Sequence, residues 1–143
     1  MTIAICASLD FMDAIFSTAE KLRGLGHTVV LPPSAEMVAR GETTLGRILQ
    51  EKETGEIAGR IAREDTFRVY YKKIQDVDAV LVLNLKKKGI EGYIGGNVFL
   101  EMGFAHVLNK KIFLLNEIPD MAYRDEIRGM QPIVLHGDLS GIS

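Results

Sequence analysis

Glu101 is the one carboxylate in the segment from Val98 to Leu108, where nearly every other side chain is apolar. A carboxylate in such a segment must pair with a cation, accept hydrogen bonds or take up a proton, because unpaired burial of a charge is costly. One interpretation is a salt bridge to a distant arginine such as Arg63 or Arg68. The other is a carboxylate kept at the floor of a pocket for chemistry. The segment alone leaves both interpretations open.

Two glycines and an asparagine lie just before this segment. Gly95 and Gly96 let a backbone approach a ligand closely, and Asn97 is predicted to cap the helix that follows. Free backbone N–H groups at such a helix start favour an anion such as a phosphate. The loop carries neither a Walker-type lysine nor a G-x-G-x-x-G fingerprint, so neither a P-loop nor a dinucleotide site is predicted. A plain loop with tight turns is the alternative.

The other polar candidates directly follow predicted strands. Ser8 and Asp10 come after the first strand, Asn84 after the third, and Asn116 with Glu117 after the fourth. In open parallel sheets, ligands bind beyond the carboxyl ends of the strands. We therefore expect Ser8, Asp10 and Asn84 to lie near the glycine-rich loop as substrate-binding residues.

Hydrophobic patterning predicts the elements that position these residues. Short apolar runs predict strands over residues 3–7, 28–31, 79–83, 112–115 and 132–135, and helical spacing predicts helices over 12–22, 43–64, 66–74, 98–108 and 122–129. Gly55 and Gly59 weaken the second helix, which is expected to be partly exposed and bent or mobile. The sequence predicts one domain, residues 1–143, with a three-layer α/β/α architecture. Its five-stranded sheet should be mostly parallel and of the Rossmann or flavodoxin-like type.

Composition and charge disfavour several classes of protein. The 17 basic and 19 acidic residues give a net charge of −2, so nothing predicts binding to nucleic acid or to a membrane. The single cysteine, Cys6, excludes an internal disulfide and is expected to be a buried, inert thiol. No segment approaches the roughly 20 apolar residues that span a bilayer, and the three histidines lack the spacing of metal ligands. We expect a cytoplasmic protein without a metal or a cofactor.

Three stretches of the chain carry a resemblance to a known family. The first strand ends in Cys6-Ala7-Ser8, a later strand reads DAVLVLN from Asp78, and a glycine-rich loop leads into GNVFLEMGFAHVLNKKIFLL. The most specific piece is an E-x-G-x-A-x-x-x-x-K-K pattern that begins at Glu101. From residue 3 to residue 115 the chain resembles the nucleoside 2-deoxyribosyltransferase-like superfamily. That superfamily includes the 2′-deoxynucleoside 5′-monophosphate N-hydrolases.

The resemblance implies a role for several residues. In that family the glutamate of this pattern attacks the anomeric carbon of a deoxyribosyl group, so Glu101 would form a glycosyl-enzyme intermediate. Ser8 and the loop 95–97 match regions that touch the sugar or a 5′-phosphate, and Asn84 matches a strand end that lines the pocket. The family commonly forms homodimers, so a homodimer or higher homo-oligomer is implied.

Two positions depart from the family pattern. Family members usually carry an aspartate eight residues before the position of Asp78, where it helps to protonate the leaving base; Tyr70 stands there in this chain. Asp65 lies earlier and substitutes only if the helix is shifted. Gly95 stands where the family usually has a polar residue.

The resemblance therefore predicts N-glycosidic bond cleavage or deoxyribosyl transfer on a nucleoside or a nucleoside 5′-monophosphate. Glu101 is the predicted nucleophile, and Tyr70 or Asp65 assists the leaving base. The alternative is a non-catalytic nucleotide-binding or sensor domain of the same fold, which the tyrosine at position 70 favours. A purely structural subunit is a third possibility, and the polar residues at the strand ends argue against it.

Overall fold

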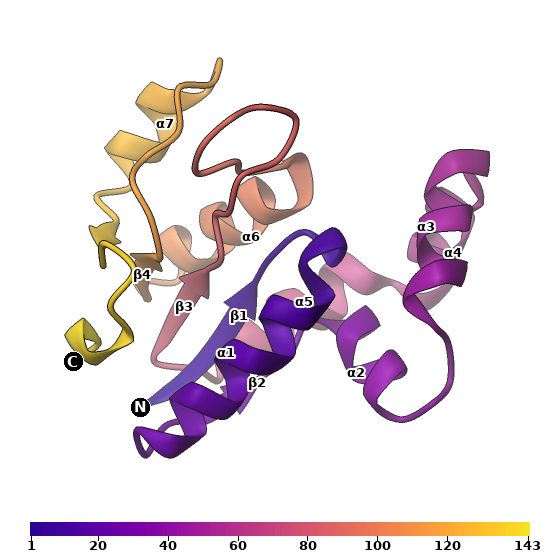
Figure 1. Ribbon diagram of the computed structural model, residues 1–143, viewed down its shortest axis with the longest axis horizontal. Coiled ribbons are helices and arrows are strands. Elements are labelled where there is room, and N and C mark those ends of the chain that lie inside the picture. The colour runs from indigo at the N-terminus through magenta and orange to yellow at the C-terminus, as the bar shows by residue number, and fades with distance from the viewer.

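A five-stranded parallel sheet forms the centre of the protein, whose 143 residues are all described by a computed structural model (Figure 1). The strands are β1 (Thr2–Cys6), β2 (Thr28–Val30), β3 (Ala79–Val82), β4 (Lys111–Leu114) and β5 (Ile133–Val134). Their order is β2-β1-β3-β4-β5, and every neighbouring pair is parallel. This is the strand order of flavodoxin-like sheets. The predicted fold class is confirmed, with the sheet parallel throughout.

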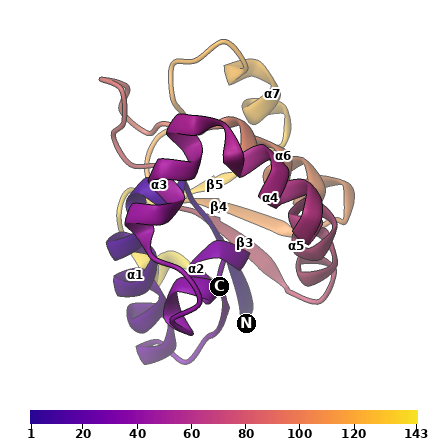
Figure 2. The same cartoon turned by 90° about the vertical axis from the view of Figure 1, so that its right-hand side faces the viewer.

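Helices cover both faces of the sheet and make three layers (Figure 2). The helices are α1 (Met12–Gly24), α2 (Pro33–Ala39), α3 (Leu45–Thr54), α4 (Glu56–Glu64), α5 (Thr66–Gln75), α6 (Gly96–Val107) and α7 (Arg124–Gly129), with single 3-10 turns at Leu9–Phe11 and Leu139–Gly141. α1 packs on one face, and α5, α6 and α7 pack on the other. None of the helices is both long and apolar enough to cross a bilayer.

The alternation of side chains along the strands builds two cores from one sheet. In β1, Ile3 and Ile5 belong to the core under α1, whereas Ala4 and Cys6 belong to the core under α5 and α6. These side chains are fully buried on both faces, as expected for the inner strands of a parallel sheet. Polar side chains that could form a site therefore lie in the segments beyond the strand ends and not on these inner strands.

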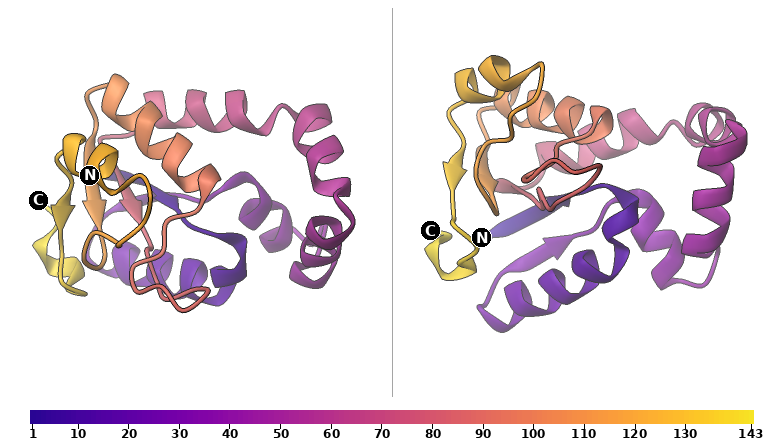
Figure 3. Two further views of the ribbon diagram at one scale, coloured as in Figure 1. Left: turned by 90° about the horizontal axis from the view of Figure 1, so that it is seen from above. Right: turned by 45° about the horizontal axis from the view of Figure 1, so that its top comes forward.

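The predicted helix over residues 43–64 is two helices. α3 ends at Gly55, whose φ of 82° is left-handed, and α4 begins directly after it. Gly59 lies inside α4 without interrupting it. A second left-handed residue, Asp65 with φ 50°, separates α4 from α5. Its carboxylate pairs with Arg68 at 3.1 Å and makes no capping hydrogen bond to α5. These two breaks let α3 and α4 stand away from the sheet as a projecting pair (Figure 3).

α6 begins two residues earlier than predicted. Gly95, with extended backbone angles, occupies the N-cap position, and the helix starts at Gly96. Asn97 lies in the first turn and its side chain makes no capping hydrogen bond, so its predicted role as a cap is wrong. The start of α6 is consequently free of side-chain caps.

Candidate active site

A cavity of about 350 Å³ lies beyond the carboxyl ends of the first strands. One wall comes from the segments after β1 and β2, a second from α3 and α4, and a third from the loop that enters α6. The lining residues are Ala7, Ser8, Leu9, Pro32, Pro33, Ser34, Lys52, Ile57, Arg60, Ile61, Thr66, Lys87, Tyr93, Gly95, Gly96, Asn97, Val98 and Glu101. Five of the predicted site residues thus meet in one place: Ser8, Gly95, Gly96, Asn97 and Glu101.

A larger depression of about 640 Å³ lies elsewhere, between the loop 89–92 and the segment after β4. Its polar groups are exposed: the carboxylates of Glu91, Glu117 and Asp120 are solvated, and Glu117 pairs with His136 at 2.5 Å. Solvated groups gain little reactivity from their surroundings. The smaller cavity, which holds the one carboxyl strongly perturbed by burial, is therefore the candidate site.

The helical repeat of α6 places Glu101 against the end of β1. Val98, Met102 and Ala105 face the core beneath this helix, and Glu101 lies on the same stripe, three residues after Val98. Side chains of the stripe point toward the sheet, and at this level the sheet ends at Cys6. The carboxyl group therefore enters the cavity at the point where β1 gives way to polar residues.

One oxygen of the Glu101 carboxyl group is buried without a hydrogen-bond partner. Its Oε2 atom is enclosed and makes no hydrogen bond, and no cation pairs with it. Burial raises the pKa of this carboxyl from 4.5 to about 8, and the neighbouring Cys6 thiol lowers it only in part. The group is therefore mostly protonated at neutral pH when the cavity is empty. The interpretation of Glu101 as one half of a salt bridge to Arg63 or Arg68 is wrong, because Glu101 forms no ion pair and Arg68 pairs with Asp65.

The first turn of α6 offers unpaired donors to the cavity. The backbone N–H groups of Gly96, Asn97 and Val98 have no protein acceptor, and all three residues line the cavity. The N-terminal end of a helix carries a partial positive charge. This stretch is suited to binding an anionic group of a ligand.

Two lysines lie at the cavity wall and are held by Asp10. Lys87 donates to Ser8 Oγ at 3.0 Å and pairs with Asp10, which also pairs with Lys52 at 3.6 Å. The hydrogen bond from Lys87 lowers the pKa of Asp10 below its ordinary value. Asp10 does not line the cavity. It positions Lys52 and Lys87, which do line the cavity.

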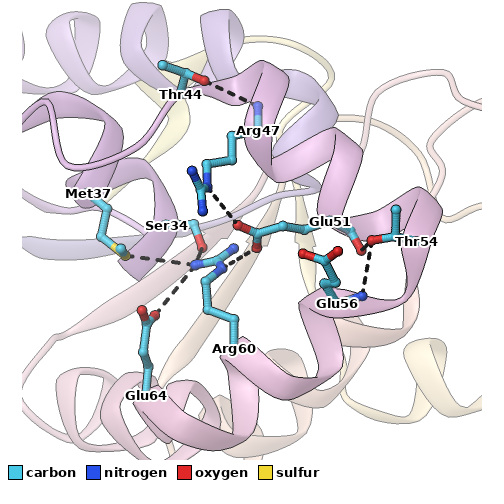
Figure 4. A network of polar contacts seen from close by, with 9 residues as sticks. All are labelled: Ser34, Met37, Thr44, Arg47, Glu51, Thr54, Glu56, Arg60 and Glu64. Atoms are coloured by element: carbon cyan, nitrogen blue, oxygen red, sulfur yellow. Dashed lines mark hydrogen bonds and ion pairs between the residues drawn. The ribbon is translucent and has the colours of Figure 1, made fainter.

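Arg60 supplies a third cation and ties three helices together (Figure 4). From α4, its guanidinium donates to Glu51 of α3 at 2.5 Å and to Ser34 of α2 at 3.3 Å. Met37 Sδ and Glu64 lie at 3.8 and 3.5 Å. Both Arg60 and Glu51 are about nine-tenths buried, so the pair replaces the hydration that each charge loses.

Asn84 is a structural residue and not a lining residue. Its side chain is fully buried and binds the backbone that follows β4. Nδ2 donates to the carbonyls of Asn116 and Glu117 at 3.0 and 2.9 Å, and Oδ1 accepts from the Asn116 N–H at 2.9 Å. With every one of these polar groups engaged, Asn84 fixes the ends of β3 and β4 beside each other.

Neither predicted acid–base residue reaches the cavity. Tyr70 is buried between α5 and the inner strand β1, where its hydroxyl donates to the Ile5 carbonyl, and burial raises its pKa well above the ordinary value. Asp65 is exposed and paired with Arg68. Neither residue lines the cavity. Nor does the chain contain three or more His, Cys, Asp or Glu side chains grouped to hold a metal ion.

A scan of protein-family models, a search of curated proteins and a search of solved structures each find no match to this chain. The function is therefore argued from the geometry of the cavity and from the chemistry of its residues.

Proposed function

We propose that the protein cleaves the N-glycosidic bond of a nucleoside or nucleoside 5′-monophosphate, or transfers its sugar, with Glu101 as the nucleophile. The observation that carries the proposal is the Glu101 carboxyl, whose Oε2 atom is buried without a hydrogen-bond partner, at the wall of a cavity of about 350 Å³. This volume falls within the range of small-molecule sites. An unpaired buried carboxyl costs stability, and such a cost is typical of groups kept for function.

In this proposal, one part of the cavity carries out the bond cleavage and another part binds the anionic group of the substrate. Glu101 attacks the anomeric carbon, and the base departs with the electrons of the glycosidic bond. Water or an acceptor base then displaces the carboxylate from the sugar, as in retaining glycoside hydrolysis. The unpaired N–H groups of Gly96, Asn97 and Val98, together with Lys87 and Ser8, favour an anionic substrate and hence the 5′-monophosphate.

Glu101 must lose its proton before it attacks. Positive charge that develops on the sugar in the transition state favours the ionised carboxylate. Because the pKa of Glu101 is about 8 in the empty site, kcat/KM should rise with pH up to about 8 and then level off. This profile distinguishes a nucleophile from a general acid, whose activity would fall over the same range.

The second candidate function is nucleotide binding without turnover. It is favoured by the absence of a second carboxyl among the cavity residues and by the protonated state of Glu101 at neutral pH. A sensor of this kind would bind the same 5′-monophosphates and would gain thermal stability from them.

The test is release of free base from a panel of ribo- and deoxyribonucleosides and their 5′-monophosphates, with and without an acceptor base. Glu101→Gln keeps the size of the side chain and should abolish turnover while retaining binding. The matched control is Glu126→Gln, an exposed carboxyl on α7, which should behave as wild type. Equal base release by wild type and Glu101→Gln would remove Glu101 from the mechanism. A rise in melting temperature without any base release would favour the sensor.

A homodimer or higher homo-oligomer is part of the same proposal. On α6, the apolar side chains of Leu100 and Val107 remain 47% and 76% exposed, and a second copy of the protein would shield them from water. Sedimentation at micromolar concentration should give at least twice the 15.8 kDa mass of one chain. A monomer at that concentration would refute this part of the proposal.

A further inference from the structure

The cavity holds a candidate nucleophile but no acid that would protonate a leaving base. Besides Glu101, its proton-bearing charged or phenolic side chains are those of Lys52, Arg60, Lys87 and Tyr93. Lysine, arginine and tyrosine are weak acids as residue types. Arg60 and Lys87 are in addition held in ion pairs with Glu51 and Asp10. No histidine and no second carboxyl lines the cavity.

The nearest groups outside the lining do not fill this role. The Tyr70 hydroxyl donates its proton to the Ile5 carbonyl, and burial disfavours its ionised form. Asp65 is exposed at the break between α4 and α5, does not line the cavity and pairs with Arg68. Glu101 itself cannot protonate the base and attack the sugar in the same step, because the attack requires the carboxylate.

The charge of the base decides whether this lack matters. A neutral purine or pyrimidine leaves as an anion unless an acid protonates it, and a positioned acid is worth about 10²- to 10⁴-fold in rate. A base whose glycosidic ring is already cationic leaves as a neutral molecule and needs no proton. Nucleosides of pyridinium rings and of N-alkylated purines belong to this second class.

A cationic ring would also prepare the nucleophile. Burial alone keeps Glu101 protonated at neutral pH, and a positive charge within a few ångströms favours the carboxylate. A neutral base offers no such assistance. The other end of the substrate would meet the unpaired N–H groups of α6 and Lys87, which suit a 5′-phosphate.

We propose that the substrate is a nucleoside 5′-monophosphate whose base carries a positive charge before the reaction begins. The inference rests on the proposed function of Glu101. A Glu101 carboxylate oxygen forms an ester bond with C1′ while the C1′–N bond breaks, and its electron pair neutralises the ring nitrogen. Water then attacks C1′, the ester bond breaks, and its electrons return to the carboxylate. The net reaction consumes one water and yields the neutral base, the sugar phosphate and one proton.

Matched pairs of nucleotides test this inference with the full-length protein. The first pair is 7-methyl-dGMP and dGMP and the second is 7-methyl-GMP and GMP, because the members of each pair differ by one methyl group and one charge. Nicotinamide mononucleotide is the pyridinium probe. Base release by Glu101→Gln is subtracted as the blank, since methylated purines also depart spontaneously. Glu126→Gln serves as the active control.

We expect kcat/KM to be at least about 100-fold higher for the cationic member of a pair, as the absence of an acid requires. For these substrates, the inflection of kcat with pH should lie below that of kcat/KM, because the bound cation favours the Glu101 carboxylate. Cleavage of the methylpurine nucleotides alone, or of nicotinamide mononucleotide alone, would support the inference and identify the ring. Equal or faster Glu101-dependent cleavage of dGMP or GMP would overturn it and leave the proposed function standing. If no nucleotide loses its base faster than in the blank, the inference fails, and the proposed function fails with it if the panel of nucleosides with an acceptor base is also inactive.

Discussion

Replacing Glu101 with glutamine should change how the stability of the protein depends on pH. The carboxyl has a pKa of about 8 in the folded protein, against an ordinary value of 4.5. Between these two values the folded state holds a proton that the unfolded state has lost. Stability therefore falls as pH rises through this window, because unfolding releases that proton and a higher pH favours its release. Glutamine cannot ionise, so the variant lacks this loss.

The size of the effect follows from the two pKa values. A pKa difference from 4.5 to about 8 corresponds to about 5 kcal/mol, since each pH unit contributes 1.36 kcal/mol. Water that enters the cavity when Glu101 ionises reduces this figure, so several kcal/mol is the expected loss between pH 5 and pH 9. At pH 5 the neutral carboxyl and the glutamine amide have similar size, and the two proteins should agree within about 1 kcal/mol.

Urea denaturation at each pH unit from 5 to 9, followed by circular dichroism, measures the free energy of unfolding. The difference between Glu101→Gln and wild type reports mainly on Glu101, because Asp10, Cys6 and Tyr70 are present in both proteins and burial, not Glu101, is the largest cause of the raised pKa of Cys6 and of Tyr70. The control Glu126→Gln, exposed on α7, should follow wild type at every pH.

The variant should be more stable than wild type at pH 9 and equal to it at pH 5. A difference that stays constant across this range would refute the reasoning, because it would mean that Glu101 has the same pKa in the folded and unfolded chains. If Glu101→Gln instead becomes progressively less stable than wild type toward pH 9, the predicted direction of the pKa shift of Glu101 is refuted.

Two further substitutions test the walls of the cavity. Arg60→Met leaves Glu51 buried without its main partner and should lower the free energy of unfolding in urea by about 3 kcal/mol. The double variant Arg60→Met/Glu51→Gln should regain most of this loss, and a double variant as unstable as the single one would contradict the pairing. Lys87→Met removes a cation next to Ser8 and should weaken binding of a nucleoside 5′-monophosphate about tenfold in calorimetry, without weakening the matching nucleoside. Equal weakening of both ligands would show that Lys87 does not meet the phosphate.

Local patterns were sufficient to predict the sheet and its two faces. The apolar runs of β1 and β3 are short and continuous, and such runs occur in strands buried on both sides. The rule that ligands bind beyond the carboxyl ends of parallel strands also predicted that Ser8 and the loop 95–97 lie near each other, and both line one cavity with Glu101. These residues were predicted together because a parallel sheet fixes where its strand ends meet.

Pairings between distant segments could not be predicted. Arg60 and Glu51 meet across the Gly55 break, where no helical spacing relates them, so the buried cation of the cavity wall was missed. Asn84 looks the same in sequence whether its amide faces a ligand or a neighbouring loop. Tyr70 falls on the apolar stripe of α5, and its place in the core follows that stripe and not the catalytic role suggested by family resemblance.

The capping asparagine was misassigned for a local reason. Asn97 is a good N-cap by residue type, but Gly95 is already extended and the helix begins at Gly96. The helix therefore starts two residues earlier than predicted, and helix ends commonly differ by one or two residues. The shift places Asn97 in the first turn and leaves the N–H groups of this turn free for a ligand.

Covalent capture of the sugar tests the central claim most directly. The protein is mixed with a 5′-monophosphate nucleotide that carries fluorine at C2′, which slows the second step, and is quenched in acid for intact-mass and peptide mass spectrometry. We predict an added mass equal to one fluorinated sugar phosphate, located on Glu101 and absent from Glu101→Gln. Base release with no adduct on Glu101, or the same adduct on Glu101→Gln, would contradict the assignment of Glu101 as the nucleophile.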